Sequence, residues 1–360
     1  MEIKGYCLPE KLDEFVKFPF QLYKGTPYSK FWVPPLISEA KKMLSVKNPF
    51  WKHAKIKIFL AQHDGKIVGR CAAIIDQNHI NVHNEKCGFF GFFECINDVI
   101  TAKSLLDEAK KFLKSEGMET IKGPANPSAN DEYGLLIEGF DSLPAIMMTY
   151  NPPYYIDLIE RSGFTKAKDL YAWLRPANVD APPRITRIVE MVKKRENIKV
   201  RHLDMKNFQR DVQYFKDIYN SAWEKNWGFV PLSDDEIDYM AEGLKPLVDP
   251  RIFHFLEVNG VPVAATLALP DYNFVLQKLN GKMGPIEIIK FLYWKRKIKL
   301  IRLMALGVKK EYRGKGLEAV LYHEILQACR NYGYTAGGEL SWPLEDNDLI
   351  NKGIEAMGGV

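Results

Sequence analysis

The sequence is poor in cysteine and has no long run of apolar residues. It contains five cysteines in 360 residues, an odd number without the regular spacing of a disulfide framework. We therefore expect reduced thiols and a cytoplasmic protein. The longer apolar runs, 71–75 and 303–308, fall far short of the roughly 20 residues that a transmembrane helix needs. Residues 1–5 lack the apolar core of a signal peptide, so no membrane partner is expected.

What is present is the composition of an ordinary globular protein. Apolar residues make up 46% and charged residues 26% of the chain, which is typical of soluble domains. The net charge of +5 is mild and suits an anionic small molecule as well as nucleic acid. A length of 360 residues favours two domains over one.

A proline-rich segment divides the chain. Pro176, Pro182 and Pro183 lie within eight residues, and prolines at this density disfavour both helix and sheet. The segment 176–184 is therefore predicted to be a linker between an N-terminal domain, 1–175, and a C-terminal domain, 185–360.

The two sides of this linker repeat one another. Asp-Gly at 64–65 and Asn-Gly at 259–260 each separate two apolar runs, and both dipeptides are typical of β-hairpins because they tolerate positive φ. The two hairpin glycines are 195 residues apart, and so are Gly163 and Gly358, each near the end of a helical stretch. Two matches at one offset indicate a duplicated domain.

Each half continues with a strand, a helix, a second strand and a second helix. In the first half, the strands and the helix between them are predicted at 89–93, 119–122 and 102–113. In the second half, the strands are predicted at 303–308 and 338–341, with a helix that begins at Gly316. About 20 additional residues, within 282–302, predict an inserted helix followed by a basic turn.

The most informative motif is a basic, glycine-containing turn after the strand 303–308. Arg313, Gly314, Lys315 and Gly316 precede a helix whose apolar stripe begins at Leu317. Glycines let the main chain approach a phosphate closely, and the N–H groups at a helix start attract anions. The turn therefore predicts an anion cradle, to which Arg313 and Lys315 add positive charge.

This turn resembles the pyrophosphate loop of the GNAT acyltransferases, whose pattern is Arg/Gln-x-x-Gly-x-Gly/Ala between a strand and a helix. Arg313 and Gly316 match its first two fixed positions, whereas Glu318 stands where the family has Gly or Ala. Other strings resemble an uncharacterised family of tandem GNAT-like bacterial and archaeal proteins; they lie at 31–35, 48–50, 88–94, 123–127, 150–155, 339–342 and 345–347.

The resemblance implies a fold and a co-substrate. The fold is α/β, with two tandem GNAT-like domains whose mixed, mostly antiparallel sheets are flanked by helices. The co-substrate is acetyl-CoA or another acyl-CoA, without a metal, and the strand residues Leu306 and Val308 would help residues 313–317 to hold it. The first-half stretch 94–101 has no glycine and two acidic residues, so that half is expected to have a degenerate cofactor loop.

Candidate catalytic residues follow the cradle helix. Glu339 lies on the next strand, where the resemblance implies a base or an anchor for the acceptor amine; the alternative is a solvent-facing carboxylate. Asn347 opens the last helix and would either bind substrate or cap that helix. Relatives commonly carry a tyrosine acid in this helix, and here that position is Ile354.

A polar and aromatic set of residues in the first half is predicted to line a substrate pocket. Its members are Asn126, Asn130, Tyr150, Asn151 and Tyr154. Because prolines accompany these residues, the alternative is a purely architectural role.

Two further clusters have simpler explanations. His79, His83 and Cys87 recur every four residues, but the asparagines among them favour a loop, and no metal site is expected. The basic and aromatic run 290–302 would suit RNA, but an amphipathic helix with extended lysines explains it without nucleic acid.

The leading hypothesis is an acyl-CoA-dependent N-acyltransferase that acts by direct transfer on a small-molecule or peptide amine, as a monomer or homodimer. No cysteine lies in the cradle or in the strand after it, so a covalent intermediate has no obvious nucleophile. The alternatives are a non-catalytic ligand-binding or sensor protein on a decayed GNAT frame and an RNA-linked transferase.

The second half lacks a counterpart of one strand. In the first half, 170–174 follows Gly163 and is expected to complete the first sheet. In the second half the sequence stops at Val360, which would leave a sheet edge unpaired. We expect the natural chain to extend further; the alternatives are another segment or a partner subunit at this edge.

Overall fold

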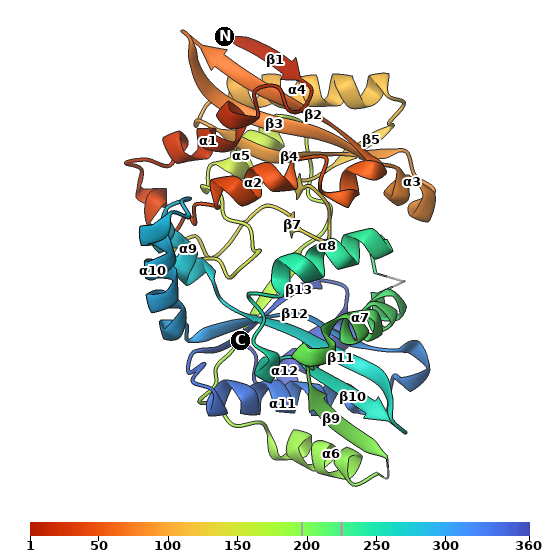
Figure 1. The fold of residues 1–360 in the computed structure, drawn as a ribbon. Helices are drawn as coiled ribbons and strands as arrows, with labels where there is room; N and C mark the ends of the chain where they lie inside the picture. Colours follow the sequence, from red (N-terminus) through yellow and green to blue (C-terminus); the bar gives the residue numbers. More distant parts are fainter. Residues whose placement is uncertain (196, 224–225) are drawn as a thin grey trace. The chain divides into compact units, whose positions relative to one another are not determined.

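The chain is described by a computed structural model that covers residues 1–195, 197–223 and 226–360 and divides into two compact units (Figure 1). Unit 1 comprises Met1–Ala167, Trp227–Val230 and Asn273–Tyr293. Unit 2 comprises Lys168–Asn226, Pro231–Tyr272 and Trp294–Val360. Each unit has its own sheet and its own core.

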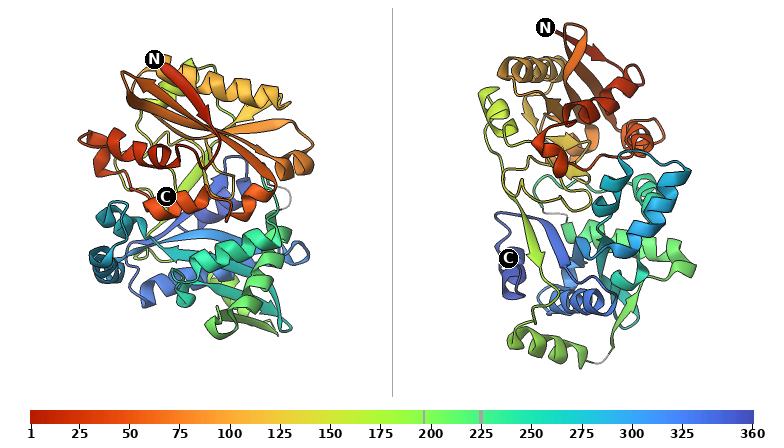
Figure 2. Two further views of the ribbon diagram at one scale, coloured as in Figure 1. Left: turned by 45° about the horizontal axis from the view of Figure 1, so that its top comes forward. Right: turned by 90° about the vertical axis from the view of Figure 1, so that its left-hand side faces the viewer.

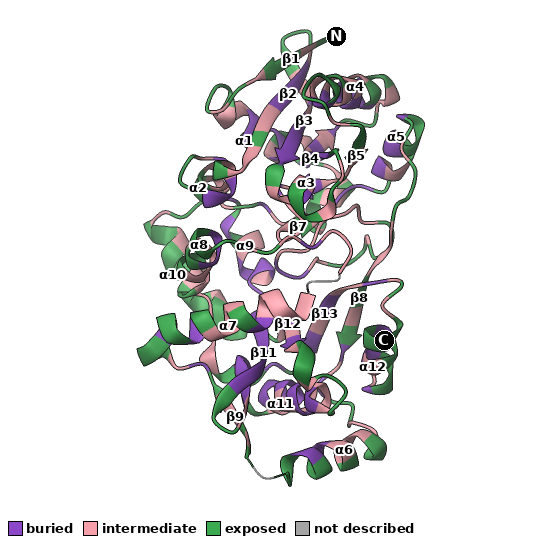
Figure 3. Ribbon diagram, turned by 90° about the vertical axis from the view of Figure 1, so that its right-hand side faces the viewer, coloured by how far each residue is buried: buried purple, intermediate pink, exposed green. Residues whose placement is uncertain are grey.

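Unit 1 is built on a five-stranded sheet in which the strands follow their order in the chain. The strands are β1 (Glu2–Tyr6), β2 (Ala54–His63), β3 (Lys66–Asp76), β4 (Cys87–Cys95) and β5 (Thr120–Lys122). Neighbouring strands are antiparallel except β4 and β5, which run parallel. Strand β3 is buried over most of its length (Figure 3), because helices pack on both faces of the sheet.

The helices of unit 1 form two cores. Helices α4 (Val99–Ser115) and α5 (Tyr155–Arg161) pack on one face of the sheet. Helices α1 (Leu12–Leu22) and α2 (Ile37–Met43) pack on the other. The remaining α-helices and strands are α3 (Gln77–His83), α9 (Asn273–Leu279), α10 (Pro285–Trp294, which continues into unit 2 at its last residue) and the short pair β6 (Ala125–Asn126) and β7 (Glu132–Tyr133).

Unit 2 contains a six-stranded sheet in the order β8-β13-β12-β11-β10-β9. The strands are β8 (Leu170–Arg175), β9 (Ile198–His202), β10 (His254–Val258), β11 (Val261–Pro270), β12 (Leu300–Val308) and β13 (Gly337–Leu344). Of these pairs, β12–β13 alone is parallel. Both sheets are therefore mixed and mostly antiparallel, as the sequence predicted.

Helices cover both faces of the unit 2 sheet (Figure 1). One face carries α7 (Phe208–Trp223) and α8 (Asp234–Leu244), and the other carries α6 (Pro183–Lys193), α11 (Leu317–Asn331) and α12 (Asp348–Ala356). Alternation along the strands divides the side chains: Phe255 packs with α7, whereas Leu256 packs with α6 and α11. Because both faces are covered, β11 is an almost continuous apolar run.

The hairpin turns confirm the predicted repeat. The β2–β3 turn has φ of +49° at Asp64 and +75° at Gly65, and the β10–β11 turn has +52° at Asn259 and +77° at Gly260. Two successive positive φ values are the type I′ geometry that Asp-Gly and Asn-Gly favour. The predicted strands and the inserted helix are also confirmed, as parts of β4, β5, β12, β13 and α10.

The predicted domain boundary after residue 175 is wrong, because β8 belongs to the second sheet. It pairs antiparallel with β13 (Figure 2), and on its other side Leu174 and Val360 exchange both backbone hydrogen bonds. Strand β8 thus fills the edge that was expected to be unpaired. The prediction assigned the strand by its place before the linker, whereas pairing depends on which sheet edge is within reach.

The predicted C-terminal domain, 185–360, also differs from unit 2, because two of its segments belong to unit 1. The side chain of Asn273 donates hydrogen bonds to the carbonyl oxygens of Pro144 and Ala145. The N–H of Ile37 donates to the carbonyl oxygen of Gly281. These contacts join the inserted helices to the first half, and nothing in their sequence spacing indicates a partner so distant along the chain.

The predicted loop around His79 and His83 is a helix, α3. The Asp76 carboxylate caps its start by accepting a hydrogen bond from the N–H of Asn78, and Asn84 ends it at a φ of +50°. Asparagine was interpreted as a loop former, but Asn84 provides the left-handed residue that ends a helix. Among the described residues, no helix combines the length and apolar character needed to cross a bilayer.

We predict opposite changes in stability for two glycines of unit 2 at which an added Cβ would meet no atom within 4 Å. Gly260→Ala forces a side chain into a φ of +77° and should lower the free energy of unfolding by about 1 kcal/mol. Gly243→Ala, inside α8, should raise it by about 0.5–1 kcal/mol because alanine restricts the unfolded chain. Urea unfolding measures both changes. A Gly260→Ala variant at least as stable as the parent protein would contradict the assigned turn, and a destabilised Gly243→Ala variant would contradict the effect expected inside the helix.

Candidate functional site

The turn between β12 and α11 has the geometry of an anion cradle. It begins with a 3₁₀ turn over Lys310–Tyr312, and Gly314 and Gly316 have φ of +71° and +78°. Gly316 is the N-cap of α11 and offers no capping side chain. Among the described residues, no acceptor binds the backbone N–H groups of Gly314, Lys315 and Gly316. Unpaired N–H groups at a helix start are well suited to phosphate oxygens.

Arg313 stabilises this turn through hydrogen bonds to backbone carbonyl oxygens. Its guanidinium donates hydrogen bonds to the carbonyl oxygens of Ser221 and Ala222 at the end of α7, at 3.1 and 2.8 Å, and more weakly to that of Val308. A second cation, Arg195, donates to the carbonyl oxygen of Lys315 at 2.9 Å. The predicted positive charge is therefore present, but Arg313 is committed to protein carbonyls, and Arg195 comes from a segment that the sequence motif does not include.

The two glycines of the turn differ in what surrounds them. An added Cβ at Gly316 would lie 3.1 Å from Val192 and 3.3 Å from Ile188, both on α6. At Gly314 it would meet no atom within 4 Å. A side chain at Gly316 would therefore contact α6 and would not enter the approach of a phosphate. Gly314 is the position at which a Cβ would enter open space.

Strands β12 and β13 diverge just before this turn. Their ladder has four pairs and ends at Leu303 and Leu340. A register shift against β11 leaves Met304 as an extra residue in β12. The predicted cofactor residues Leu306 and Val308 lie beyond this point; they pair with β11, and their side chains pack in the core under α11. Any contact that they make with a cofactor is therefore through the backbone.

Glu339 belongs to a buried polar chain on the face of the sheet opposite α11. It is the ladder partner of Arg302. Their neighbours Leu303 and Leu340 line a small cavity under α11 and α12, so Arg302 and Glu339 point to the α7 side. Ser341 donates to Glu339 Oε1 at 2.7 Å and accepts from Arg302 Nε at 2.9 Å. Burial raises the pKa of Glu339, and the lowering effects of Ser341 and Arg302 do not offset it.

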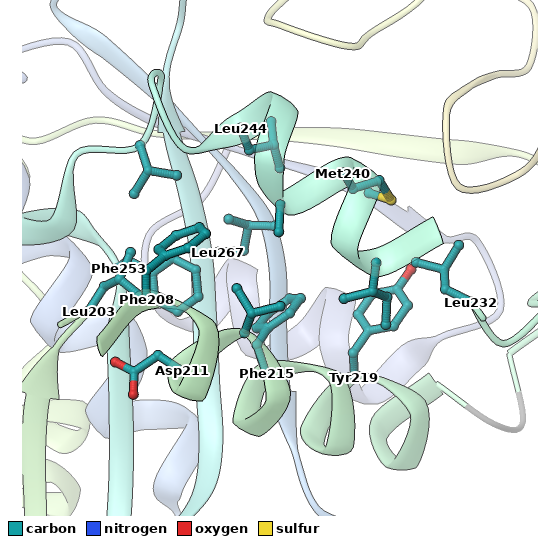
Figure 4. A pocket seen from close by; sticks show the side chains of 14 residues that line it. Leu203, Phe208, Asp211, Phe215, Tyr219, Leu232, Met240, Leu244, Phe253 and Leu267 are labelled. Carbon is teal, nitrogen blue, oxygen red and sulfur yellow. The ribbon is translucent and has the colours of Figure 1, made fainter. Parts of the chain in front are cut away.

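An apolar cavity of about 70 Å³ lies on this same face, between α7, α8 and the sheet (Figure 4). Phe215 and Tyr219 enter it from α7, Met240 and Leu244 from α8, and Leu267 from β11. Among the described residues that line it, the one carboxylate is that of Asp211, which is paired with Arg201 at 2.6 Å. The cavity is thus suited to a hydrocarbon rather than to a polar group.

Tyr322 is a candidate that the sequence reasoning missed. It projects from α11 into the small cavity that Ile354 also lines, next to the diverging strands. Burial and the neighbouring Glu318 carboxylate raise the pKa of its hydroxyl. The GNAT resemblance implies a tyrosine acid at the position of Ile354 on the last helix, which this chain lacks; here a tyrosine reaches the same cavity from the preceding helix. The signal was available, because Tyr322 is four residues from Glu318 and therefore on the same side of α11.

Asn347 caps α12, as one of its two interpretations predicted. Its Oδ1 accepts a hydrogen bond from the N–H of Ile350 at 3.4 Å. Participation of Asn347 in catalysis remains a prediction.

The corresponding turn of unit 1 is closed by its own side chains. Asp98 caps α4 by accepting from the N–H of Thr101 at 2.8 Å, so a carboxylate occupies the place of an incoming anion. The ladder of β4 and β5 ends at Phe89 and Lys122, and Ala125 then lies against Gly91, where an added Cβ would be 1.7 Å from its carbonyl oxygen. In unit 1, the chain itself thus occupies the gap beyond the β4–β5 ladder, whereas unit 2 leaves the corresponding gap between β12 and β13 open.

The five predicted pocket residues make hydrogen bonds within unit 1. In each of these bonds a side chain of the set pairs with a backbone group. Asn126 accepts from the N–H of Phe92, and Asn151 bonds both the N–H and the carbonyl oxygen of Leu136. Asn130, Tyr150 and Tyr154 donate to the carbonyl oxygens of Val230, Phe140 and Cys95, respectively. These bonds agree with the architectural alternative. The pocket itself remains a prediction.

Unit 1 also contains a cluster of metal-binding residue types. Ligand atoms of His79, Glu85 and Cys87 lie within 4.8 Å of one another. However, the Lys122 ammonium is 2.6 Å from Glu85 Oε1, and His79 Nε2 is 2.7 Å from the same oxygen. The carboxylate is therefore already neutralised, and the geometry is explained by an ion pair.

Two known proteins are similar to this chain over nearly its whole length. It is 33% identical to protein YghO of Escherichia coli, over 99% of this chain and 92% of that protein. It is also 33% identical to the bacterial ceramide synthase of Caulobacter vibrioides, over 98% of this chain and 92% of that protein. No family profile matches the chain.

Solved structures identify the fold. A tandem GNAT protein from the clavulanic acid biosynthesis pathway matches with a TM-score of 0.56 at 11% identity, over 99% of this chain and 95% of that chain. A GCN5-related N-acetyltransferase from Sphaerobacter thermophilus matches with a TM-score of 0.52 at 10% identity, over 99% and 92%. The predicted GNAT-like fold is therefore confirmed.

Proposed function

Since this chain belongs to the family of protein YghO and the bacterial ceramide synthase, we propose that it is an acyl-CoA-dependent N-acyltransferase whose acceptor is the amine of a long-chain base. A ceramide is the amide of a fatty acid and a long-chain amino alcohol, so the name of the second relative describes N-acylation of such an amine. The observation that carries the proposal for this chain is the apolar cavity on the face of Glu339.

The co-substrate is held in unit 2. The backbone N–H groups of residues 314–316 bind the pyrophosphate, with Arg195 and Lys315 supplying positive charge. The backbone of Leu306 and Val308, beyond the last pair of the β12–β13 ladder, holds the pantetheine arm. The acyl group is proposed to be that of a fatty acid by analogy with the second relative, because a ceramide is a fatty amide.

The reaction is a direct transfer. The neutral acceptor amine attacks the thioester carbonyl and loses a proton from its nitrogen to Glu339; the C–N bond forms, the C–S bond breaks, and Tyr322 protonates the departing thiolate. Arg302 and Ser341 position Glu339. Cys329 lines the small cavity with Tyr322, but burial raises the pKa of its thiol to about 12, so it stays protonated and is no nucleophile.

Unit 1 serves as a scaffold without a co-substrate of its own. Asp98 occupies the helix start, and Ala125 and Asn126 fill the gap between the diverging strands. The competing function is a ligand-binding protein that has lost turnover, which Glu318 next to Tyr322 favours because its negative charge opposes a phosphate or a thiolate nearby. Binding and turnover measured on the same protein decide between the two.

Calorimetry with coenzyme A tests the cradle. Gly314→Ala should weaken binding at least tenfold, because a Cβ enters the approach to the N–H groups. Gly333→Ala is the matched control: it also has positive φ, +86°, and open space, but it lies beyond the other end of α11. Equal affinity in both variants, or binding by neither variant nor the parent protein, would reject the assignment.

The acceptor class is tested by turnover with long-chain and short-chain amines. Ala241→Phe fills the apolar cavity and should lower kcat/KM for a long-chain base at least tenfold while sparing a short-chain amine. Ala336→Phe, at an exposed position, is the control. A parent protein that binds coenzyme A but acylates no amine would support the ligand-binding alternative.

The pH dependence of kcat/KM tests the base. Activity requires ionised Glu339, so it should fall as the pH drops through the raised pKa of this group, above the range of an ordinary glutamate near 4.3. Ser341→Ala removes a hydrogen bond that stabilises the carboxylate and should move this fall to higher pH. Glu339→Gln should abolish the fall in activity at low pH and reduce the rate about 10²–10⁴-fold. An unchanged profile in both variants would exclude Glu339 as the base.

A further inference from the structure

Helix α6 lies beside the turn that begins α11, although it does not belong to the glycine motif (Figure 1). Side-chain carbons of Ile188 and Val192 lie 3.3 and 3.1 Å from an added Cβ at Gly316. Lys193, the last residue of α6, forms an ion pair with Glu324 of α11. The end of α6 is therefore held next to the cradle that residues 314–316 form.

Arg195 follows the end of α6 and is anchored to the turn at one nitrogen. Its Nη1 donates to the carbonyl oxygen of Lys315 at 2.9 Å. Among the described residues, no acceptor binds its Nε or Nη2, and the residue is exposed. These two nitrogens form the edge of a guanidinium that can donate two parallel hydrogen bonds to a phosphate. Arg195 is thus held beside the cradle while its phosphate-binding edge stays open.

In the described part of the chain, no carboxylate pairs with Arg195. The carboxylate of Glu324 on α11 is bound to Lys193. Lys194 and Lys315, which precede Arg195 and accept its hydrogen bond, respectively, are exposed cations. Because the end of a helix presents carbonyl oxygens rather than N–H groups, an anion at the end of α6 depends on such cationic side chains.

We propose that Arg195 binds the 3′-phosphate of coenzyme A, with Lys194 adding positive charge. This inference rests on the proposed function. Coenzyme A carries this third phosphate on its ribose, beyond the pyrophosphate that the N–H groups of residues 314–316 are proposed to hold. An acyl carrier protein holds the same pantetheine arm through one phosphodiester, without a ribose, and would leave Arg195 without a ligand. The acyl donor is therefore a free coenzyme A thioester rather than an acyl group on a carrier protein.

Calorimetry with coenzyme A and 3′-dephospho-coenzyme A tests this proposal without turnover. The parent protein should bind coenzyme A about tenfold or more tightly than the dephospho form, because charge-assisted hydrogen bonds are lost with the phosphate. Arg195→Ala should bring the ratio of the two affinities close to one. Arg195→Lys keeps the charge but not the planar edge and should give a smaller ratio than the parent protein. Arg187→Ala is the matched control: it removes the same charge from an exposed position about two turns earlier and should keep the parent ratio.

Equal affinity of the parent protein for both ligands would overturn this inference and leave the proposed function in place. An unchanged ratio in Arg195→Ala would do the same, because an arginine that only stabilises the turn through Lys315 would affect both ligands equally. Binding of neither ligand by the parent protein would reject the cradle and, with it, the proposed function. Thermal unfolding checks that the variants are folded.

Discussion

The candidate site of unit 2 depends on the early end of the β12–β13 ladder. Backbone N–H and C=O groups need partners, and a parallel pair normally provides them along its whole length. Here pairing stops at Leu303 and Leu340, and the extra residue Met304 turns the strand at the same point. This break provides an unpaired backbone next to the glycine turn, and it positions Tyr322 and Glu339 on either side of the sheet.

Unit 1 has the same break and a different outcome. Its β4–β5 ladder is shorter still, with three pairs, but Ala125 and Asn126 close the gap, and Asn126 accepts from the N–H of Phe92. Where unit 2 has Gly314 and Gly316, unit 1 has Asp98, whose carboxylate satisfies the helix start. The same duplicated fold therefore occurs once with the gap beyond the ladder filled, in unit 1, and once with the gap unfilled, in unit 2. A few residues at equivalent positions account for this difference.

The sequence predicted what local chemistry decides. The hairpins at 64–65 and 259–260, the strand–turn–helix around Gly314 and the cap at Asn347 all follow from residues a few positions apart. It did not predict the pairing of β8 with β13 or the attachment of Asn273 to Pro144, because these contacts join parts of the chain more than 100 residues apart. For the same reason Arg195 was missed, whereas Tyr322 lay within the motif and was overlooked.

The exchange of segments between the halves has a consequence for synthesis of the chain. Unit 1 contains Asn273–Tyr293, so its last contacts, such as that of Gly281 with Ile37, form only when three quarters of the protein has left the ribosome. The first 167 residues must therefore wait, partly assembled, while most of unit 2 is being made. A nascent chain of this kind exposes apolar surface for longer than two independent domains would, and the two halves cannot be shuffled as separate modules.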